Sequence, residues 1–372
     1  PAMPAAIAPL LRALLLTTAL LLAGCAQSGG TPTYYWQSLR GHLALLQAAR
    51  PVQEWIAAPD TPAPLRARLA LAQQARDFAV SDLALPDNAS YRRYARLDRK
   101  AAVWNVVAAG PYSLELHRWC FPITGCIGYR GYFDEADARA EGRQLAQAGL
   151  EVNVYGVPAY STLGYSNWLG GDPLLSTFIA WPEGDFVRLL FHELAHQQVY
   201  VEGDTAFNES YATAVERLGV RRWLELHAQP AARAQFEASE QHRAQFRALT
   251  RATRARLTEI YASNTAEAYG QQALTVMKTE AMQHFHADYA ALRARWLAQQ
   301  MAPAQLAALD LWVREANNAS FAAQGAYDDL VPAFMALFER EGRDWPRFHA
   351  AVRALTRLPQ PEREAALKAL PG

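Results

Sequence analysis

The stretch Phe186–Val201, FVRLLFHELAHQQVYV, decides the fold, because its apolar composition predicts a buried helix. Within it, His192 and His196 are four residues apart and project from the same helical face. Two imidazoles at this spacing can bind one zinc ion. Glu193 lies about 100° around the helix from His192, where its carboxylate can reach a water on the metal without binding the metal itself. The stretch therefore predicts a catalytic metal centre.

A second helix is expected over Ala206–Leu218, after a turn capped by Asp204 or Thr205, and we expect it to end at Gly219. The two helices then form a hairpin that can place a third ligand against the histidines. Glu209 and Glu216 lie on one face of this helix but differ in height by about 10 Å, so only one of them can bind the metal. The spacing alone leaves the choice open.

The rest of the chain predicts an α+β fold that is predominantly α. Helices are expected over Leu39–Trp55, over Leu65–Leu83 and from Asp134 to a stop at Gly149. Short β-branched or aromatic runs predict strands in a small mixed sheet over residues 101–181, namely Val103–Val107, Ser113–His117, Gly128–Phe133, Leu150–Val157 and Leu174–Trp181. Residues 185–372 are expected to be helical throughout, with the active-site helix first and the glutamate helix second. Residues 32–372 thus form one expected domain.

The first residues predict a targeting segment. An apolar run over residues 13–23 is too short to span a bilayer and suits a signal peptide, which we place at 1–24. It ends in Leu-Ala-Gly-Cys25, which resembles the bacterial lipobox and implies an acylated Cys25 followed by a flexible linker over 25–31. The alternative is an ordinary secretory signal. We expect a lipoprotein of the bacterial cell envelope facing the periplasm, on the outer rather than the inner membrane.

Export would place the remaining cysteines, Cys120 and Cys126, in an oxidising compartment. They lie in a turn-rich stretch, where a structural disulfide is expected. A zinc pair would need further ligands nearby, and a redox pair favours a closer spacing.

The charge balance excludes a strongly electrostatic partner. Lys and Arg together number 36, Asp and Glu together also number 36, and the formal net charge is zero. Nucleic-acid binding is therefore not expected.

Asn208-Glu209-Ser-Tyr-Ala212 resembles the Asn-Glu-x-x-Ala element that carries the third ligand in gluzincin metallopeptidases. The resemblance implies that Glu209 is the ligand, and it leaves Glu216 to support a ligand or to bind the amine of a substrate. The interval between His196 and Glu209 is shorter than in the best-known gluzincins.

A wider resemblance covers nearly the whole chain, and it is to a bacterial family of lipoproteins that is named for an aminopeptidase activity inferred from the zinc motif. It rests on the two histidine and glutamate motifs together with the blocks Trp119–Phe133, Ala159–Gly164, Asp172–Thr177 and Asn317–Phe334. The resemblance implies a zincin-like peptidase that holds one Zn²⁺ per chain and uses Glu193 as general base on a peptide substrate.

Other roles are less constrained. Tyr327 is the residue we expect to stabilise the oxyanion, and Asp172 or Glu216 could bind a substrate ammonium, because the Gly-x-Met-Glu-Asn element of gluzincin aminopeptidases is absent. The strand Leu174–Trp181 could pair with an extended substrate. The alternatives are an envelope metalloendopeptidase and a non-catalytic zinc lipoprotein that acts in binding or assembly. The sequence does not determine the oligomeric state.

Overall fold

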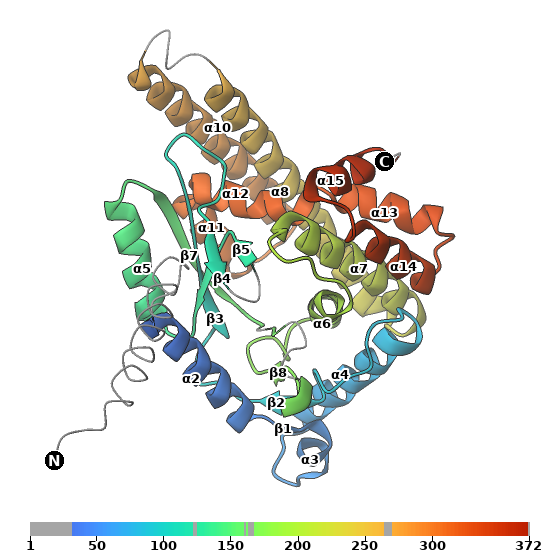
Figure 1. Ribbon diagram of the computed structural model, residues 1–372. Helices are drawn as coiled ribbons and strands as arrows, with labels where there is room; N and C mark the ends of the chain where they lie inside the picture. The colour runs from blue at the N-terminus through green and yellow to red at the C-terminus, as the bar shows by residue number, and fades with distance from the viewer. Residues whose placement is uncertain (1–31, 122–124, 160, 163–166, 264–269, 371–372) are drawn as a thin grey trace, which may run out of the picture.

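Helices make up most of the computed structural model, which describes residues 32–121, 125–159, 161–162, 167–263 and 270–370 (Figure 1). The helices are α2 (Pro32–Ala48), α3 (Val52–Ala57), α4 (Ala63–Ser81), α5 (Glu135–Gln147), α6 (Glu183–Gln198), α7 (Thr205–Leu226), α8 (Pro230–Ala262), α10 (Gln271–Ala298), α11 (Pro303–Glu315), α12 (Asn318–Asp328), α13 (Val331–Arg340), α14 (Trp345–Leu355) and α15 (Gln360–Lys368). The predicted α+β class with mainly helical content is confirmed. No helix within the described ranges is both long enough and apolar enough to cross a membrane.

The strands are short, and in the described part of the chain they form three small sheets where a single mixed sheet was predicted. They are β1 (Arg50–Pro51), β2 (Arg93–Ala95), β3 (Val103–Ala109), β4 (Trp119–Phe121), β5 (Gly125–Ile127), β6 (Arg130–Tyr132), β7 (Glu151–Val157) and β8 (Leu174–Leu175). The order β6-β3-β7 is antiparallel throughout, β4 pairs with β5, and only β1-β2-β8 is mixed. Two strands of the mixed sheet precede residue 101, so the predicted bounds of the sheet region were wrong as well.

Two predicted strands are missing or shortened, for reasons of tertiary pairing. β7 pairs along the whole of one edge of β3, and β6 pairs with Trp104–Val106 on the other edge. The stretch Ser113–His117 therefore meets only the end of β3, through an isolated bridge from Leu116 to Ala109. The predicted strand Leu174–Trp181 is reduced to β8, whose two residues are buried and pair in parallel with β2. It therefore offers no long free edge to a substrate.

The helix boundaries follow local chemistry. The helix predicted over Leu39–Trp55 is divided into α2 and α3, because Pro51 lacks an amide proton and disfavours a helical residue before it. The prediction for α5 is confirmed: Asp134 caps it by accepting from the amides of Ala136 and Asp137, and Gly149 follows with a φ of 86°.

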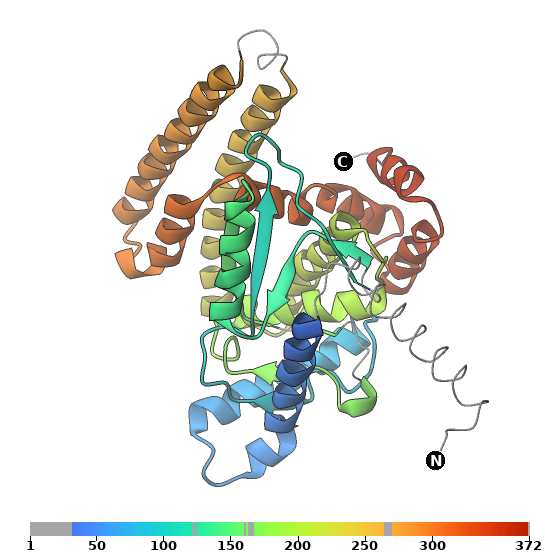
Figure 2. The ribbon, with the colours of Figure 1, turned by 60° about the vertical axis from the view of Figure 1, so that its left-hand side comes forward.

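The helix α7 continues through Gly219, where we had expected it to end. A Cβ at this position would lie 2.7 Å from Leu83 and 2.9 Å from Phe191. The glycine therefore allows α7 to pack closely against α6, which carries Phe191. This packing belongs to the main core, in which α6 and α7 are surrounded by residues of α4, α13 and α14. A second core lies between α8, α10 and α11, and the α8–α10 pair projects from the rest of the molecule in both ribbon views (Figure 2).

Candidate metal centre

The hairpin of α6 and α7 places the histidine and glutamate motifs against each other. Asp204 caps α7 by accepting from the amide of Phe207, and the same carboxylate forms a 2.7 Å ion pair with Arg363. Asn208 then fixes the turn between the helices. Its amide oxygen accepts from the Val201 amide at 2.8 Å, and its amide nitrogen donates to the Val201 carbonyl at 2.7 Å. These two bonds position the neighbouring Glu209 against α6.

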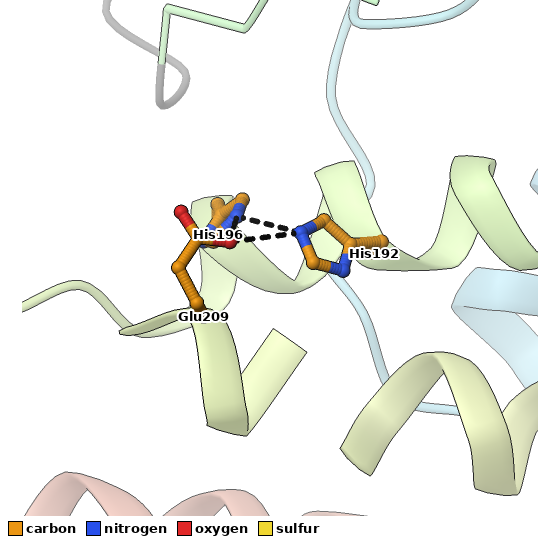
Figure 3. A group of neighbouring side chains, drawn as sticks. All are labelled: His192, His196 and Glu209. Atoms are coloured by element: carbon orange, nitrogen blue, oxygen red, sulfur yellow. Dashed lines mark hydrogen bonds and ion pairs between the residues drawn. The ribbon is translucent and has the colours of Figure 1, made fainter. Parts of the chain in front are cut away.

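Three side chains converge on one point between the helices. His192, His196 and Glu209 are all buried, and they point toward one another (Figure 3). The Nε2 atoms of the two histidines are 3.1 Å apart, and Oε2 of Glu209 lies 3.2 Å from Nε2 of His192 and 3.5 Å from Nε2 of His196. Two helices thus hold three potential ligand atoms in a small triangle.

The triangle has the dimensions of a tetrahedral zinc site. With bonds of about 2.0–2.1 Å, the ligand atoms around a tetrahedral zinc lie roughly 3.3 Å apart. The three observed separations bracket that value. Within the described ranges, the ligand group contains these three side chains and no fourth one. Three protein ligands and an open fourth position are typical of catalytic rather than structural zinc.

Glu216 lies on the other side of the His192 ring. Its Oε2 is 2.9 Å from Nδ1 of His192, and its second oxygen is 3.9 Å from the guanidinium of Arg188. With Nδ1 engaged in this way, the Nε2 atom of His192 is the one directed at Glu209. Glu216 is therefore placed to orient His192, a candidate ligand, and such a supporting position is one of the roles that the sequence left open for it.

The charges in this cluster stabilise one another. Burial alone would lower the pKa of His192, but its hydrogen bonds to Glu209 and Glu216 hold that pKa well above the ordinary value. Burial would raise the pKa of Glu209, and the two histidines lower it to about 2. Glu216 likewise keeps a lowered pKa against the effect of burial, chiefly through Arg188 and His192. The cluster therefore favours ionised carboxylates, the form in which glutamate binds a metal.

Glu193 lines a cavity of about 610 Å³ together with the three ligand side chains. Burial raises the pKa of Glu193, an effect that the two neighbouring histidines reduce. A raised pKa lies closer to pH 7, and a carboxylate accepts and releases protons most effectively when its pKa is near the ambient pH. Glu193 thus lies at the cavity wall with a raised pKa, while His192, His196 and Glu209 face one another in the same cavity.

The other walls of the cavity are mainly aromatic and apolar. They come from the start of α2, from the face of the β6-β3-β7 sheet and from the β4-β5 hairpin, and they include Tyr34, Tyr35, Val103, Phe121, Ile127, Phe133 and Val157. Among the described lining residues, the only carboxylates are Glu193 and Glu209. The cavity is therefore suited to an apolar or aromatic group rather than a strongly charged one.

Four tyrosines in the described lining, Tyr34, Tyr35, Tyr129 and Tyr200, were not predicted from the sequence as site residues. Tyr129 precedes β6 and Tyr200 follows α6, and both reach the cavity that contains the metal ligands. Burial raises the pKa of Tyr129 well above its ordinary value, and the negative charge of Glu209 adds to the effect. The Tyr129 hydroxyl is thus a neutral proton donor near the ligand triangle. No local sequence signal separates it from the other tyrosines of the chain.

The remaining predicted residues lie elsewhere or outside the described ranges. Asp172 is fully buried and does not line the cavity; its carboxylate accepts from the amide and hydroxyl of Thr162 and from Gln197. Tyr327 lies on α12, but its side chain is outside the described residues, as are Cys25 and the proposed signal peptide and linker. Cys120 and Cys126 face each other in the β4-β5 pair and are joined by a disulfide.

Comparison with protein families adds an independent finding. A family model described as "Putative aminopeptidase" matches residues 33–367. The chain belongs to this family. The match includes α6, α7 and every described residue that lines the cavity. Searches of curated proteins and of solved structures find no match. The family description therefore indicates an aminopeptidase activity, and the chemistry has to be argued from the site.

Proposed function

We propose that this chain is a zinc-dependent peptidase of the zincin type, with aminopeptidase action on peptides. The observation that carries the proposal is the triangle of His192, His196 and Glu209 on the wall of a cavity that also receives Glu193. His192, His196 and Glu209 would hold one Zn²⁺ per chain. The family description supports hydrolysis at the amino end of the substrate.

Each residue of the site has a distinct task in the proposed reaction. When bound, zinc would polarise the scissile carbonyl and lower the pKa of a coordinated water. Glu193 would take a proton from the attacking water and return it to the leaving amine. Glu216 would hold the His192 ring in orientation through its 2.9 Å contact with Nδ1.

The cavity suggests how a substrate would be positioned. Its aromatic and apolar walls favour a peptide with a bulky uncharged side chain next to the scissile bond. The Tyr129 hydroxyl, which burial keeps protonated, could donate to the oxygen that gains charge during attack. We assign this donor role to Tyr129 first and retain Tyr327 as the alternative.

The cavity also favours a second candidate, an endopeptidase. An aminopeptidase usually binds the free ammonium of its substrate with carboxylates, yet the described lining offers only Glu193 and Glu209. Glu216 is engaged with His192, and Asp172 is engaged with Thr162 and Gln197. If no acidic group outside the described residues supplies the amine contact, cleavage would not require a free amino end.

The proposal includes a location. Acylation at Cys25 would anchor the domain to a membrane of the bacterial envelope, most simply the outer membrane with the domain in the periplasm. The Cys120–Cys126 disulfide supports an oxidising compartment. A non-catalytic zinc lipoprotein is less favoured, since a structural site normally has four protein ligands.

Matched peptide pairs would test the proposal. Fluorogenic peptides with an aromatic residue before the scissile bond would be supplied with free and with acetylated amino ends to the zinc-loaded full chain. Cleavage of the free peptides alone supports aminopeptidase action, and equal cleavage of both supports the endopeptidase. Absence of cleavage for every peptide, in protein shown to hold zinc, would contradict a peptidase that prefers apolar side chains.

A further inference from the structure

The outer face of α2 carries an exposed apolar stripe. Seven large apolar side chains are exposed among the described residues, and three of them lie on this helix. Trp36 is 65% exposed, Leu39 51% and Leu43 42%. Spacings of three and four residues place them along one side of the helix. An apolar stripe that faces solvent is the usual mark of an interaction surface.

The opposite face of α2 is firmly attached to the body of the protein. The Gln37 side chain donates to the Gly131 carbonyl and accepts from the Phe133 amide. The Tyr34 ring lies under the guanidinium of Arg130, at 4.1 Å from its centre. Gly41 packs so closely on Phe133 that a Cβ there would lie 2.2 Å from that ring. The outward direction of the stripe is therefore fixed by contacts on the other side.

The charge on α2 suits an anionic surface. The helix contains no acidic residue, and Arg40, which is exposed, lies beside the apolar stripe. A helix with tryptophan and leucine on one face and a flanking arginine has the composition of a segment that lies in a membrane interface. In Figure 1 α2 lies at the lower left edge of the molecule, and in Figure 2, where that side comes forward, it lies in front of the rest of the chain.

The position of α2 in the chain identifies the bilayer as the partner. The helix begins at Pro32, 32 − 25 = 7 residues after Cys25. Seven extended residues span at most about 25 Å. If Cys25 is acylated, as the proposed function includes, α2 is the part of the described chain that is kept nearest to the lipid. A short tether of this kind gives a weakly binding surface a high effective concentration.

We propose that the outer face of α2, defined by Trp36, Leu39 and Leu43, docks onto an anionic phospholipid bilayer. The docked helix is also a wall of the active cavity, because Tyr34, Tyr35 and Ser38 line it. Membrane docking would therefore orient the cavity relative to the bilayer. A further exposed leucine, Leu169, lies near the C-terminal end of α2, where Arg93 donates to the carbonyls of Leu46, Ala49 and Leu169.

Site-directed labels on the full chain would test this surface. A nitroxide or a polarity-sensitive dye would be attached to Leu43→Cys and, in a separate protein, to Leu311→Cys on α11, which has a matched exposure of 43%. Each protein would be reconstituted in vesicles of phosphatidylethanolamine and phosphatidylglycerol. We expect the label at 43 to report a lipid environment and the label at 311 to report water. Leu39→Gln should lower the ratio of docked to undocked protein, read at position 43, about tenfold, whereas Leu226→Gln, at a matched exposure of 49%, should not.

The alternatives give different results. Equal water exposure of both labels in vesicles would overturn the proposal, and so would shielding of the label at 43 without vesicles, which would indicate a second copy of the chain. Mass spectrometry of Cys25 in the same sample separates a missing anchor from a missing docking surface. The readout does not depend on zinc or hydrolysis, so the result is independent of the proposed peptidase activity.

Discussion

Oε2 of Glu216 lies 2.9 Å from Nδ1 of His192, while Nε2 on the other side of the same ring lies 3.2 Å from Oε2 of Glu209. One imidazole is thus held between two carboxylates, one at each nitrogen. Both glutamates that the sequence offered as ligands therefore reach His192, but only Glu209 also reaches His196. Because Glu209 and Glu216 are two turns apart along α7, they reach different nitrogen atoms of the His192 ring.

Glu216→Gln should weaken zinc affinity about 10- to 100-fold, because an amide holds the imidazole less firmly and no longer adds negative charge behind it. Glu209→Gln should weaken it further, because a ligand is lost. Chelator competition titrations would measure both. Glu240→Gln is a matched control, since Glu240 also pairs with Arg188, and its other ion pairs among the described residues are with Arg243 and Arg247. Equal affinity in Glu216→Gln and the wild type would contradict the role assigned to Glu216.

Glu193→Gln should keep both the fold and the zinc but lower hydrolysis by about 10²- to 10⁴-fold, because only the proton acceptor is removed. Zinc content and turnover would be measured on the same preparation. Near-normal turnover with full zinc content would show that Glu193 is not the base. A loss of zinc would instead indicate that Glu193 acts as a ligand.

Tyr129→Phe should lower kcat about a hundredfold with little change in KM, the expected effect of losing a donor that acts mainly in the transition state. Tyr327→Phe and Tyr200→Phe would be measured in parallel on the same peptide. If Tyr327→Phe alone shows the loss, the donor is the tyrosine that we predicted from the sequence and Tyr129 is a wall residue.

The histidine pair could be predicted because its geometry is local. Four residues of helix fix the relative position of His192 and His196 whatever the rest of the chain does. The choice between Glu209 and Glu216 was not local, since it depends on how α7 packs along α6. Resemblance to the Asn-Glu-x-x-Ala element suggested Glu209, and the structure adds a reason for the asparagine: its two bonds to Val201 close the turn.

The strands and the cavity tyrosines depend on long-range pairing. The stretch Ser113–His117 has the composition of a strand, yet β7 fills one edge of β3 and β6 fills part of the other, which leaves only an isolated bridge at Ala109. Tyr129, which precedes β6, lines the same cavity as His192, His196 and Glu209, which lie on α6 and α7, far away in the chain. Such positions follow from the tertiary arrangement, so a single sequence cannot single them out.

Asn208→Ala should destabilise the protein by about 2 kcal/mol, because two hydrogen bonds are lost and the amide of Val201 loses its partner, while the Val201 carbonyl keeps the Asp204 amide at 3.3 Å. Zinc affinity should also fall, since Glu209 follows directly in the chain. Urea unfolding of the zinc-free protein would measure the first effect and chelator competition the second. An unchanged midpoint of unfolding would show that the turn is stable without Asn208.

His349 should make the protein less stable in acid. Its Nδ1 lies 2.8 Å from the Tyr211 hydroxyl and its Nε2 lies 2.8 Å from the Leu83 carbonyl, within the core. Burial lowers the pKa of His349 from 6.5 to about 4, an effect that the bond to Leu83 only partly offsets. The unfolded chain therefore binds a proton below pH 6.5 that the folded protein accepts only near pH 4. The contribution of His349 to the free energy of unfolding is fully present above pH 6.5. It falls as the pH drops toward 4, by about 2 kcal/mol between pH 7 and pH 5.

His349→Gln removes the titrating group and keeps one donor and one acceptor for the same partners. The free energy of unfolding in urea would be measured at pH 7 and pH 5 for both proteins, without zinc so that ligand protonation at the metal centre does not contribute through binding. The wild type should lose about 2 kcal/mol more than the variant over this interval. An equal loss in both proteins would mean that His349 is already protonated in the folded state, or that its environment leaves its pKa near the ordinary value. The variant should also be less stable at pH 7, because an amide fills the aromatic pocket around Trp345 and Phe348 less well than an imidazole.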